Sequence, residues 1–501
     1  MAIAPEPLMG CFKATTGMLS RGGLLSRLAG RVKSPPSGLA TRCRLATCPT
    51  LIALLIIGAY ADPDGTTPLH WAVRSDDLKQ VQALLKNGAH VNAANRYGIT
   101  PLALAVENAN PVIADLLLKA GADAKASLPG GQTILMTAAR TGNAEIVKSL
   151  LARGADPNAA ESQYGETALM WAAAENHSAA AAMLVEFGAT VNTRSKALEY
   201  SKDRFGLEGV TTILPHGSWT ALMYAARQGS TETAKTLVAS HADLNITDPD
   251  GTTALVFAII NGHFDTAALL VESGADPNIA DSAGMAALYA AVDMNTLGEV
   301  YGRPGRTFAN KLSAVDLIKL LRTHGANPNA QLKSATLYRA HTPGEGTLAD
   351  GSTPLMRAAK NGDAAAMRLL LANGADASII QKNHTTALML AAGYGRGQGV
   401  FAKDYATESE MAEGVRVLLE HGVDVNAVND NGQTALHFAA QASDEIVRLL
   451  AAHGAKLEMK DKNGRTPVDF AMGVGLRGRA GGPVEVRQHT AVLLRQLAQQ
   501  Q

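Results

Sequence analysis

Two histidines, His70 and His437, occupy the same place in a short motif that begins with Thr and ends with Ala. Histidine serves as a general base or a metal ligand near neutral pH. The same place in the other copies of the motif holds mostly apolar residues: Ala103, Met136, Met170, Met223, Val256, Tyr289, Met356 and Met389. A place that accepts such residues is a packing position, so we predict structural histidines and no catalytic residues.

A glycine pattern at residues 473–478 matches the fingerprint of dinucleotide-binding loops. It follows a predicted helix and not a strand, so the βαβ unit that cradles a phosphate is missing. The three cysteines, Cys11, Cys43 and Cys48, all precede the repeats and offer the folded body no zinc cluster or disulfide framework. We therefore expect no cofactor, no metal and no enzyme. The alternative hypothesis is an enzyme whose active site lies in an insertion between the repeats.

Composition narrows the classes of partner. Of the 501 residues, 47% are hydrophobic and 18% charged, which is typical of a chain that buries a core. Lys plus Arg equals Asp plus Glu, 45 each, so the basic excess of nucleic-acid binders is absent, and we expect no nucleic-acid partner. The apolar run at residues 51–57 is too short to cross a bilayer, so we expect no transmembrane segment.

The helices that must position any site are indicated by internal repetition. Copies of the motif recur 33 residues apart in most cases, as from Thr67 to Thr100. They start at Thr67, Thr100, Thr133, Thr167, Thr220, Thr253, Ala286, Thr353, Thr386, Thr434 and Thr466. A repeated unit of this length predicts a stack of supersecondary units in one continuous body.

Each copy has the same order of turn, capping and helix residues. A turn pair such as Asp64-Gly65 precedes the Thr, because glycine takes positive φ without steric cost. The Thr caps a helix, and proline often follows at the first helical position. Five residues after the Thr the residue is always Ala, which predicts close packing of helix backbones. A second helix ends in paired aliphatics and a glycine, as in Leu84-Leu85 before Gly88.

The chain therefore resembles the ankyrin repeat family. Residues 67–72 and 434–439 match its signature hexapeptide, and the resemblance covers residues 62–472 as about ten full repeats and a terminal one. It implies an all-α, right-handed solenoid of helix-turn-helix units, with a hairpin-like turn, here called a finger, between units. The alanine-rich composition resembles that of bacterial members of the family.

The domain organisation follows from the spacings. The array at residues 62–472 carries insertions at 193–217, 293–310, 330–350 and 393–411, and residues 473–501 are predicted as a glycine-rich loop and a capping helix. His241 and His384 stand where glycine is usual. Ala286 replaces the capping Thr, so the seventh unit is predicted to be a soft point.

Residues 1–61 form a basic leader with more than one interpretation. Residues 1–50 hold seven basic residues and one acid, and Ala59-Tyr60-Ala61 has the form of a signal-peptidase site, which predicts an exported or periplasmic protein, with Met18 as a later possible start. An arginine-rich transit peptide is a second interpretation. A third takes residues 51–59 as the second helix of a degenerate first repeat, in a cytoplasmic protein.

The resemblance also implies where partners bind. In that family the exposed variable positions flank the turn glycine and lie seven and eight residues after the Thr. The partner-binding residues expected here are Arg74, Arg96, Tyr97, Glu107, Asn108, Arg140, Thr141, Tyr164, Glu175, Arg227, Gln228, Asn261, Lys360, Asn361 and Tyr394. Four of the positions seven residues after the Thr are basic and favour an acidic protein surface: Arg74, Arg140, Arg227 and Lys360. Trp71 and Trp171 are expected in the core, and Arg357 at the surface.

The function that follows is a non-catalytic scaffold, expected to be a monomer, that binds another protein of unknown identity. A regulatory or inhibitory subunit of an enzyme is a narrower form of the same hypothesis.

Overall fold

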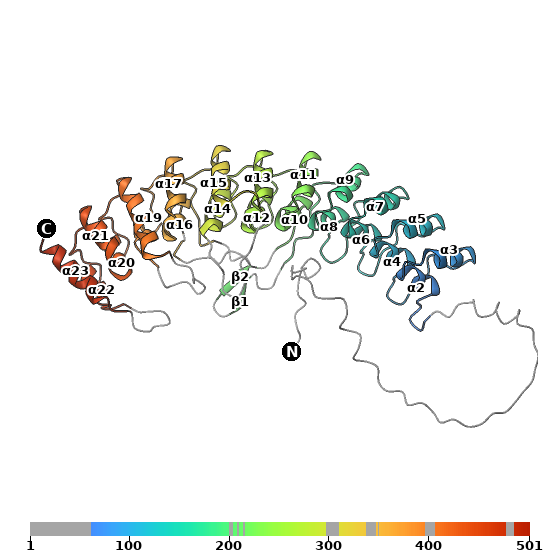
Figure 1. Ribbon diagram of the computed structural model, residues 1–501, viewed down its shortest axis with the longest axis horizontal. Helices are drawn as coiled ribbons and strands as arrows, with labels where there is room; N and C mark the ends of the chain where they lie inside the picture. Colours follow the sequence, from blue (N-terminus) through green and yellow to red (C-terminus); the bar gives the residue numbers. More distant parts are fainter. Residues whose placement is uncertain are drawn as a thin grey trace, which may run out of the picture.

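The computed structural model describes residues 62–199, 204–207, 210–213, 216–296, 310–336, 347–348, 350–395, 406–476 and 485–500. Helices alternate between two rows that follow an arch, with one row on its concave side (Figure 1). The predicted all-α solenoid is confirmed. The leader predicted at residues 1–61 lies outside the described residues.

The inner row lines the concave side (Figure 1). Its helices are α2 (Pro68–Arg74), α4 (Pro101–Glu107), α6 (Ile134–Thr141), α8 (Ala168–Ala174), α10 (Ala221–Gln228), α12 (Ala254–Ile260), α14 (Ala287–Thr296), α16 (Pro354–Lys360), α18 (Ala387–Ala391), α20 (Ala435–Ala442) and α22 (Pro467–Ala471). Each inner helix contacts the next inner helix along the chain.

The outer row covers the convex side (Figure 1). Its helices are α3 (Leu78–Lys86), α5 (Pro111–Lys119), α7 (Ala144–Leu151), α9 (Ser178–Glu186), α11 (Thr231–Ala239), α13 (Phe264–Glu272), α15 (Ala314–Thr323), α17 (Ala364–Ala372), α19 (Glu408–Glu420) and α21 (Asp444–Ala452). The last helix, α23 (Gln488–Ala498), packs against α21 and α22, where the sequence predicts a capping helix.

The repeated residues act as their chemistry predicts. The hydroxyl of Thr100 accepts the backbone N–H of Ala103 at 3.2 Å, and the equivalent bond recurs at Thr133 and Thr353. The alanine five residues after the Thr is at most 1% exposed in every unit, so a larger side chain would force the inner helices apart. His241 and His384 take positive φ, 61° and 59°, in place of the usual glycine.

Asparagines tie consecutive fingers together. The side chain of Asn278 donates to the carbonyl of Gly325 at 3.0 Å and accepts the amide of Asn327 at 2.7 Å. Asn92, Asn158, Asn329 and Asn426 make the same pair of bonds with the next unit. These bonds keep the fingers in register, including across the insertion that starts after α14.

The insertions leave the array without breaking the stack. In the first, β1 (Arg204–Leu207) pairs antiparallel with β2 (Val210–Ile213), forming a small hairpin below the inner row (Figure 1). α14 extends to Thr296, and α19 already begins at Glu408, so both helices take residues from predicted insertions. Residues 297–309, 337–346 and 396–405, which hold most of the other three insertions, lie outside the described residues.

Candidate functional site

The candidate site is the concave side, where the inner helices and the fingers present side chains. Seven of the residues expected to bind a partner are exposed: Arg74, Arg96, Tyr97, Glu107, Asn108, Glu175 and Gln228. Seven are half-buried: Arg140, Thr141, Tyr164, Arg227, Lys360, Asn361 and Tyr394. One expectation is wrong, because Asn261 is 6% exposed and its amide donates to the carbonyl of Phe257 within α12.

Two expectations about neighbouring residues are also wrong. Trp71, expected in the core, is 51% exposed, and its indole donates to Asp62 at 2.9 Å. Arg357, expected at the surface, is 7% exposed and forms an ion pair with the buried Asp293 of the preceding unit. A guanidinium takes an inner-helix position that is aromatic or aliphatic in most units, and Asp293 on α14 supplies its carboxylate.

The basic residues expected to attract an acidic partner already have contacts within the chain. Arg140 pairs with Glu107 at 2.9 Å and lies over the ring of Trp171. Arg227 stacks on Trp219 with its guanidinium carbon 5.0 Å from the ring centroid. Lys360 donates to the carbonyl of Tyr394 at 3.0 Å. These contacts reduce the charge that the face offers to a partner.

The two motif histidines are structural, as predicted. The Nδ1 of His70 lies 2.8 Å from the hydroxyl of Thr67, and its Nε2 lies 2.9 Å from the carbonyl of Ile99 in the next unit. His437 is fully buried and makes the same two contacts with Thr434 and Arg465. Burial lowers the pKa of His437, so the ring is neutral near pH 7 and joins two units without a charge.

An aromatic cluster forms where the first insertion leaves the array. Trp219 precedes the capping Thr220, and its ring contacts Tyr224 edge-on at 5.4 Å and Phe257 at 5.1 Å between centroids. The insertion holds Trp219 in place, because the hydroxyl of Ser195 accepts the backbone N–H of Trp219 at 3.0 Å. The cluster therefore belongs to the fifth and sixth units but depends on the finger between the fourth and fifth.

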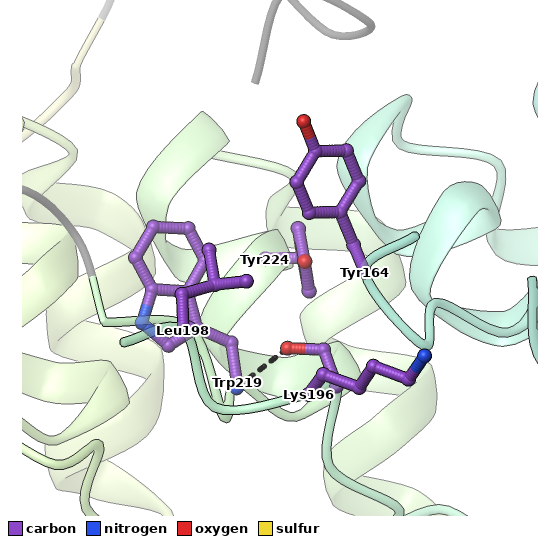
Figure 2. Close-up of a pocket in the computed structure, with 7 residues that line it drawn as sticks. Tyr164, Lys196, Leu198, Trp219 and Tyr224 are labelled. Carbon is purple, nitrogen blue, oxygen red and sulfur yellow. Dashed lines mark hydrogen bonds between the residues drawn. The ribbon is translucent and has the colours of Figure 1, made fainter. Parts of the chain in front are cut away.

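A pocket opens beside this cluster (Figure 2). Trp219 and Tyr224 line it together with Tyr164 and Leu198, so most of its wall is aromatic or aliphatic. Lys196 also lines it, but its ammonium points away from Tyr224 in Figure 2 and donates to the carbonyl of Ser162 at 2.5 Å. The pocket is narrow, because Trp219 and Tyr224 are themselves buried, and the half-buried Tyr164 is the most accessible of its rings.

A carboxyl group lies next to the pocket. The hydroxyl of Tyr224 donates to Oε1 of Glu166 at 2.6 Å. Burial raises the pKa of Glu166, and the neighbouring charge of Glu161 raises it further, whereas the bond from Tyr224 opposes the rise. Glu161 itself accepts three backbone amides of its finger, from Gln163, Tyr164 and Glu166, and so is a turn residue.

Glu166 was missed at the level of sequence, although a signal existed. It occupies the residue directly before the capping Thr. In the other units that place holds Thr66, Ile99, Gln132, Trp219, Thr252, Met285, Ser352, Thr385, Gln433 and Arg465. Glu166 is the single acid in the series, and an acid in a mostly uncharged series marks a departure from plain packing.

Two other kinds of feature are absent from the described residues. Among them, no group of three His, Cys, Asp or Glu side chains is arranged to hold a metal ion. Within the same residues, no helix combines the length and the apolar character needed to cross a membrane.

Comparison with known families gives a match to the family described as ankyrin repeats (3 copies), over residues 42–127, 113–195, 205–298, 307–401 and 404–476. These segments cover most of the chain and include the aromatic cluster, whereas Lys196 and Leu198 of the pocket lie between two of them. Comparison with curated proteins gives no match.

Proposed function

Since this chain belongs to the ankyrin repeat family, whose repeats are generally modules of protein–protein interaction, we propose that it is a non-catalytic scaffold that binds one partner protein. The binding surface is the concave side, with the inner helices as its floor and the fingers as its rim. The working form is a monomer, because the stack buries its core within one chain.

One observation carries this proposal: an open pocket with aromatic walls lies on the concave side at the fourth and fifth units, and a half-buried carboxyl group lies beside it. Tyrosine and tryptophan are enriched among the residues that dominate binding energy, and they act best in desolvated pockets. Trp71 on α2 and Tyr97 in the finger after the first unit are also exposed, and each lies beside an arginine. These two rings add aromatic contact surface at the amino-terminal end of the array.

Affinity capture from the source cells tests the proposal. The full chain and its Tyr164→Ala variant serve as baits in parallel, and captured proteins are identified by mass spectrometry. A direct partner is expected to bind the full chain and to lose most of its signal with the variant. Phe187→Ala, which removes an exposed ring from the convex side, is the matched control and is expected to keep the partner. A partner that binds both variants equally contradicts the proposed surface.

We also propose that the protein is exported and that its leader is cleaved after Ala61. Asp62 is bonded into the first finger: its amide donates to the carbonyl of Thr66 at 2.8 Å, and its carboxylate accepts the indole N–H of Trp71. A new amino terminus at Asp62 keeps both bonds. The family match from residue 42 supports the other interpretation, a degenerate first repeat.

The outer helix of the first unit supports the export proposal. Gln80 is exposed, whereas the equivalent Ile113 and Ile146 of the next two units are buried. A polar residue at a stacking position is typical of a terminal unit whose outer side faces water. Amino-terminal sequencing of the protein from its cells is expected to give Asp62 as the first residue. An intact leader contradicts export.

A further inference from the structure

Glu166 carries a charge that the rest of the chain leaves uncompensated. It accepts a hydrogen bond from Tyr224, but it forms no ion pair with any Lys, Arg or His among the described residues. Taking a carboxylate out of water without a cation is costly, so natural proteins usually pair such a group. Because Glu166 stays half-exposed on the concave side, a cation from outside the chain reaches it.

The cations nearest in the array are held elsewhere. Arg140 lies over the ring of Trp171 and pairs with Glu107. Arg227 lies over the ring of Trp219. Both guanidinium groups contact other residues, so a cation from a partner protein can pair with Glu166.

The surroundings of Glu166 are aromatic. Tyr164 and Tyr224 line the adjoining pocket, and the indole of Trp171 acts on Glu166 through a side-chain hydrogen bond that lowers its pKa. Aromatic faces attract cations, and guanidinium groups stack on such faces more readily than ammonium groups do. A carboxylate beside aromatic walls therefore favours a planar cation.

We propose that Glu166, Tyr164 and Tyr224 form an anchor site for a basic side chain of the partner protein, with arginine preferred over lysine. The guanidinium lies against the half-buried ring of Tyr164 and donates to the carboxylate of Glu166, which the hydroxyl of the buried Tyr224 holds in place. This inference rests on the proposed function and names the chemistry of its partner. This anchor site therefore selects a basic side chain of the partner, whereas the sequence predicts a partner with an acidic surface.

Selection from a displayed library of random short peptides tests this site on the full chain. Peptides retained by the wild type are expected to share one enriched basic position, with arginine more frequent than lysine. Glu166→Gln keeps the shape of the side chain and its bond from Tyr224 but removes the charge. We expect this variant to bind the selected peptides about tenfold or more weakly, since the guanidinium loses its counter-charge.

The matched control is Glu186→Gln, which removes an exposed charge from α9 in the same unit. It is expected to bind the selected peptides like the wild type. A second measurement leaves the protein unchanged: the selected peptide is resynthesised with citrulline, the neutral isostere of arginine, and is expected to lose the same affinity. This comparison stays informative even if Glu166→Gln folds poorly.

Selected peptides without an enriched basic residue refute the arginine site, and so do peptides whose binding ignores Glu166→Gln and citrulline. Equal binding of arginine and lysine peptides refutes the stated preference. If no peptide is retained at all, the site fails, and the affinity capture with Tyr164→Ala decides separately whether the proposed binding function stands.

Discussion

The hydroxyl of Tyr224 lies 2.6 Å from Oε1 of Glu166 and joins two repeats that are separated in sequence by the first insertion. Tyr224 stands on the inner helix of the fifth unit, and Glu166 ends the finger of the fourth. The bond therefore joins α10 of the fifth unit to the finger that precedes α8 of the fourth unit, at the edge of the pocket. Its energetics depend on the charge of the carboxyl group.

Stability is expected to respond to pH through Glu166. Because burial raises its pKa in the folded protein above the ordinary 4.5, the folded state takes up a proton before the unfolded state as pH falls. The contribution of this group to stability therefore increases as pH falls through the raised pKa towards 4.5, and it is lost as pH rises. Relative to Glu166→Gln, the wild type is expected to gain melting temperature between pH 7 and pH 5.

The measurement is a pair of thermal unfolding curves at each pH, because the other titrating groups affect both proteins equally. Glu186→Gln is expected to follow the wild type, since this carboxylate is exposed. A difference between wild type and Glu166→Gln that stays constant over this range would falsify the assigned burial effect.

The buried ion pair between Arg357 and Asp293 predicts a large local cost. Both residues are under 9% exposed, so removing the guanidinium takes away the charge that balances a buried carboxylate. Arg357→Ala is expected to lower the free energy of unfolding by about 3–5 kcal/mol. Denaturant titration measures this loss.

The double variant Asp293→Leu with Arg357→Met separates the two causes. Apolar side chains of similar volume remove both charges, so much of the lost stability is expected to return. If the double variant is as unstable as Arg357→Ala, the cost arises from packing and not from the unpaired charge.

Sequence predicted the architecture well because its signals are local and repeated. The capping Thr, the buried Ala at the fifth place and the turn glycine each act within one unit, and one unit's chemistry recurs in the next. Trp71, Arg357 and Asn261 were misplaced for a different reason: their burial depends on what the neighbouring unit or insertion brings to them. The burial of Arg357 depends on the carboxylate that Asp293 on α14 of the preceding unit supplies.

The candidate site was predicted only in outline. The expected residues on fingers and inner helices include Tyr164 and Arg227, which lie at the aromatic cluster. Trp219, Tyr224 and Glu166 are not among the expected residues. The pocket exists because the first insertion displaces one finger, and the spacing of motifs gives the length of an insertion but not the course of its backbone.

The neutral ring of His437 makes the carboxyl-terminal units sensitive to acid. Burial lowers its pKa below the ordinary 6.5, so the unfolded state binds a proton first as pH falls. This contribution to stability is complete above pH 6.5 and is lost below it, towards the lowered pKa. His437→Met, which installs the residue found at the same place in several units, is expected to remove this dependence, as measured by hydrogen exchange of α20 and α22 at pH 7 and pH 5.

A control for this prediction is His453→Met, because His453 is exposed at the end of α21. The protection factors of α20 and α22 in this variant, corrected for the pH dependence of intrinsic exchange, are expected to fall on acidification as in the wild type. The assignment to His437 does not survive if His437→Met and the wild type lose protection to the same extent.

The seventh unit lacks its capping hydroxyl, and restoring it is expected to stabilise the array. Ala286 is 3% exposed, and Thr253 and Thr353 fit the equivalent place at 2% each, so a threonine has room. Its hydroxyl would accept a backbone N–H in the first turn of α14, as Thr253 does for Val256 at 3.3 Å. Ala286→Thr is therefore expected to raise the free energy of unfolding by about 1 kcal/mol. Ala286→Val, which has the same shape without the acceptor, is expected to give no such gain in denaturant titration, and an equal gain in both variants would assign the effect to packing.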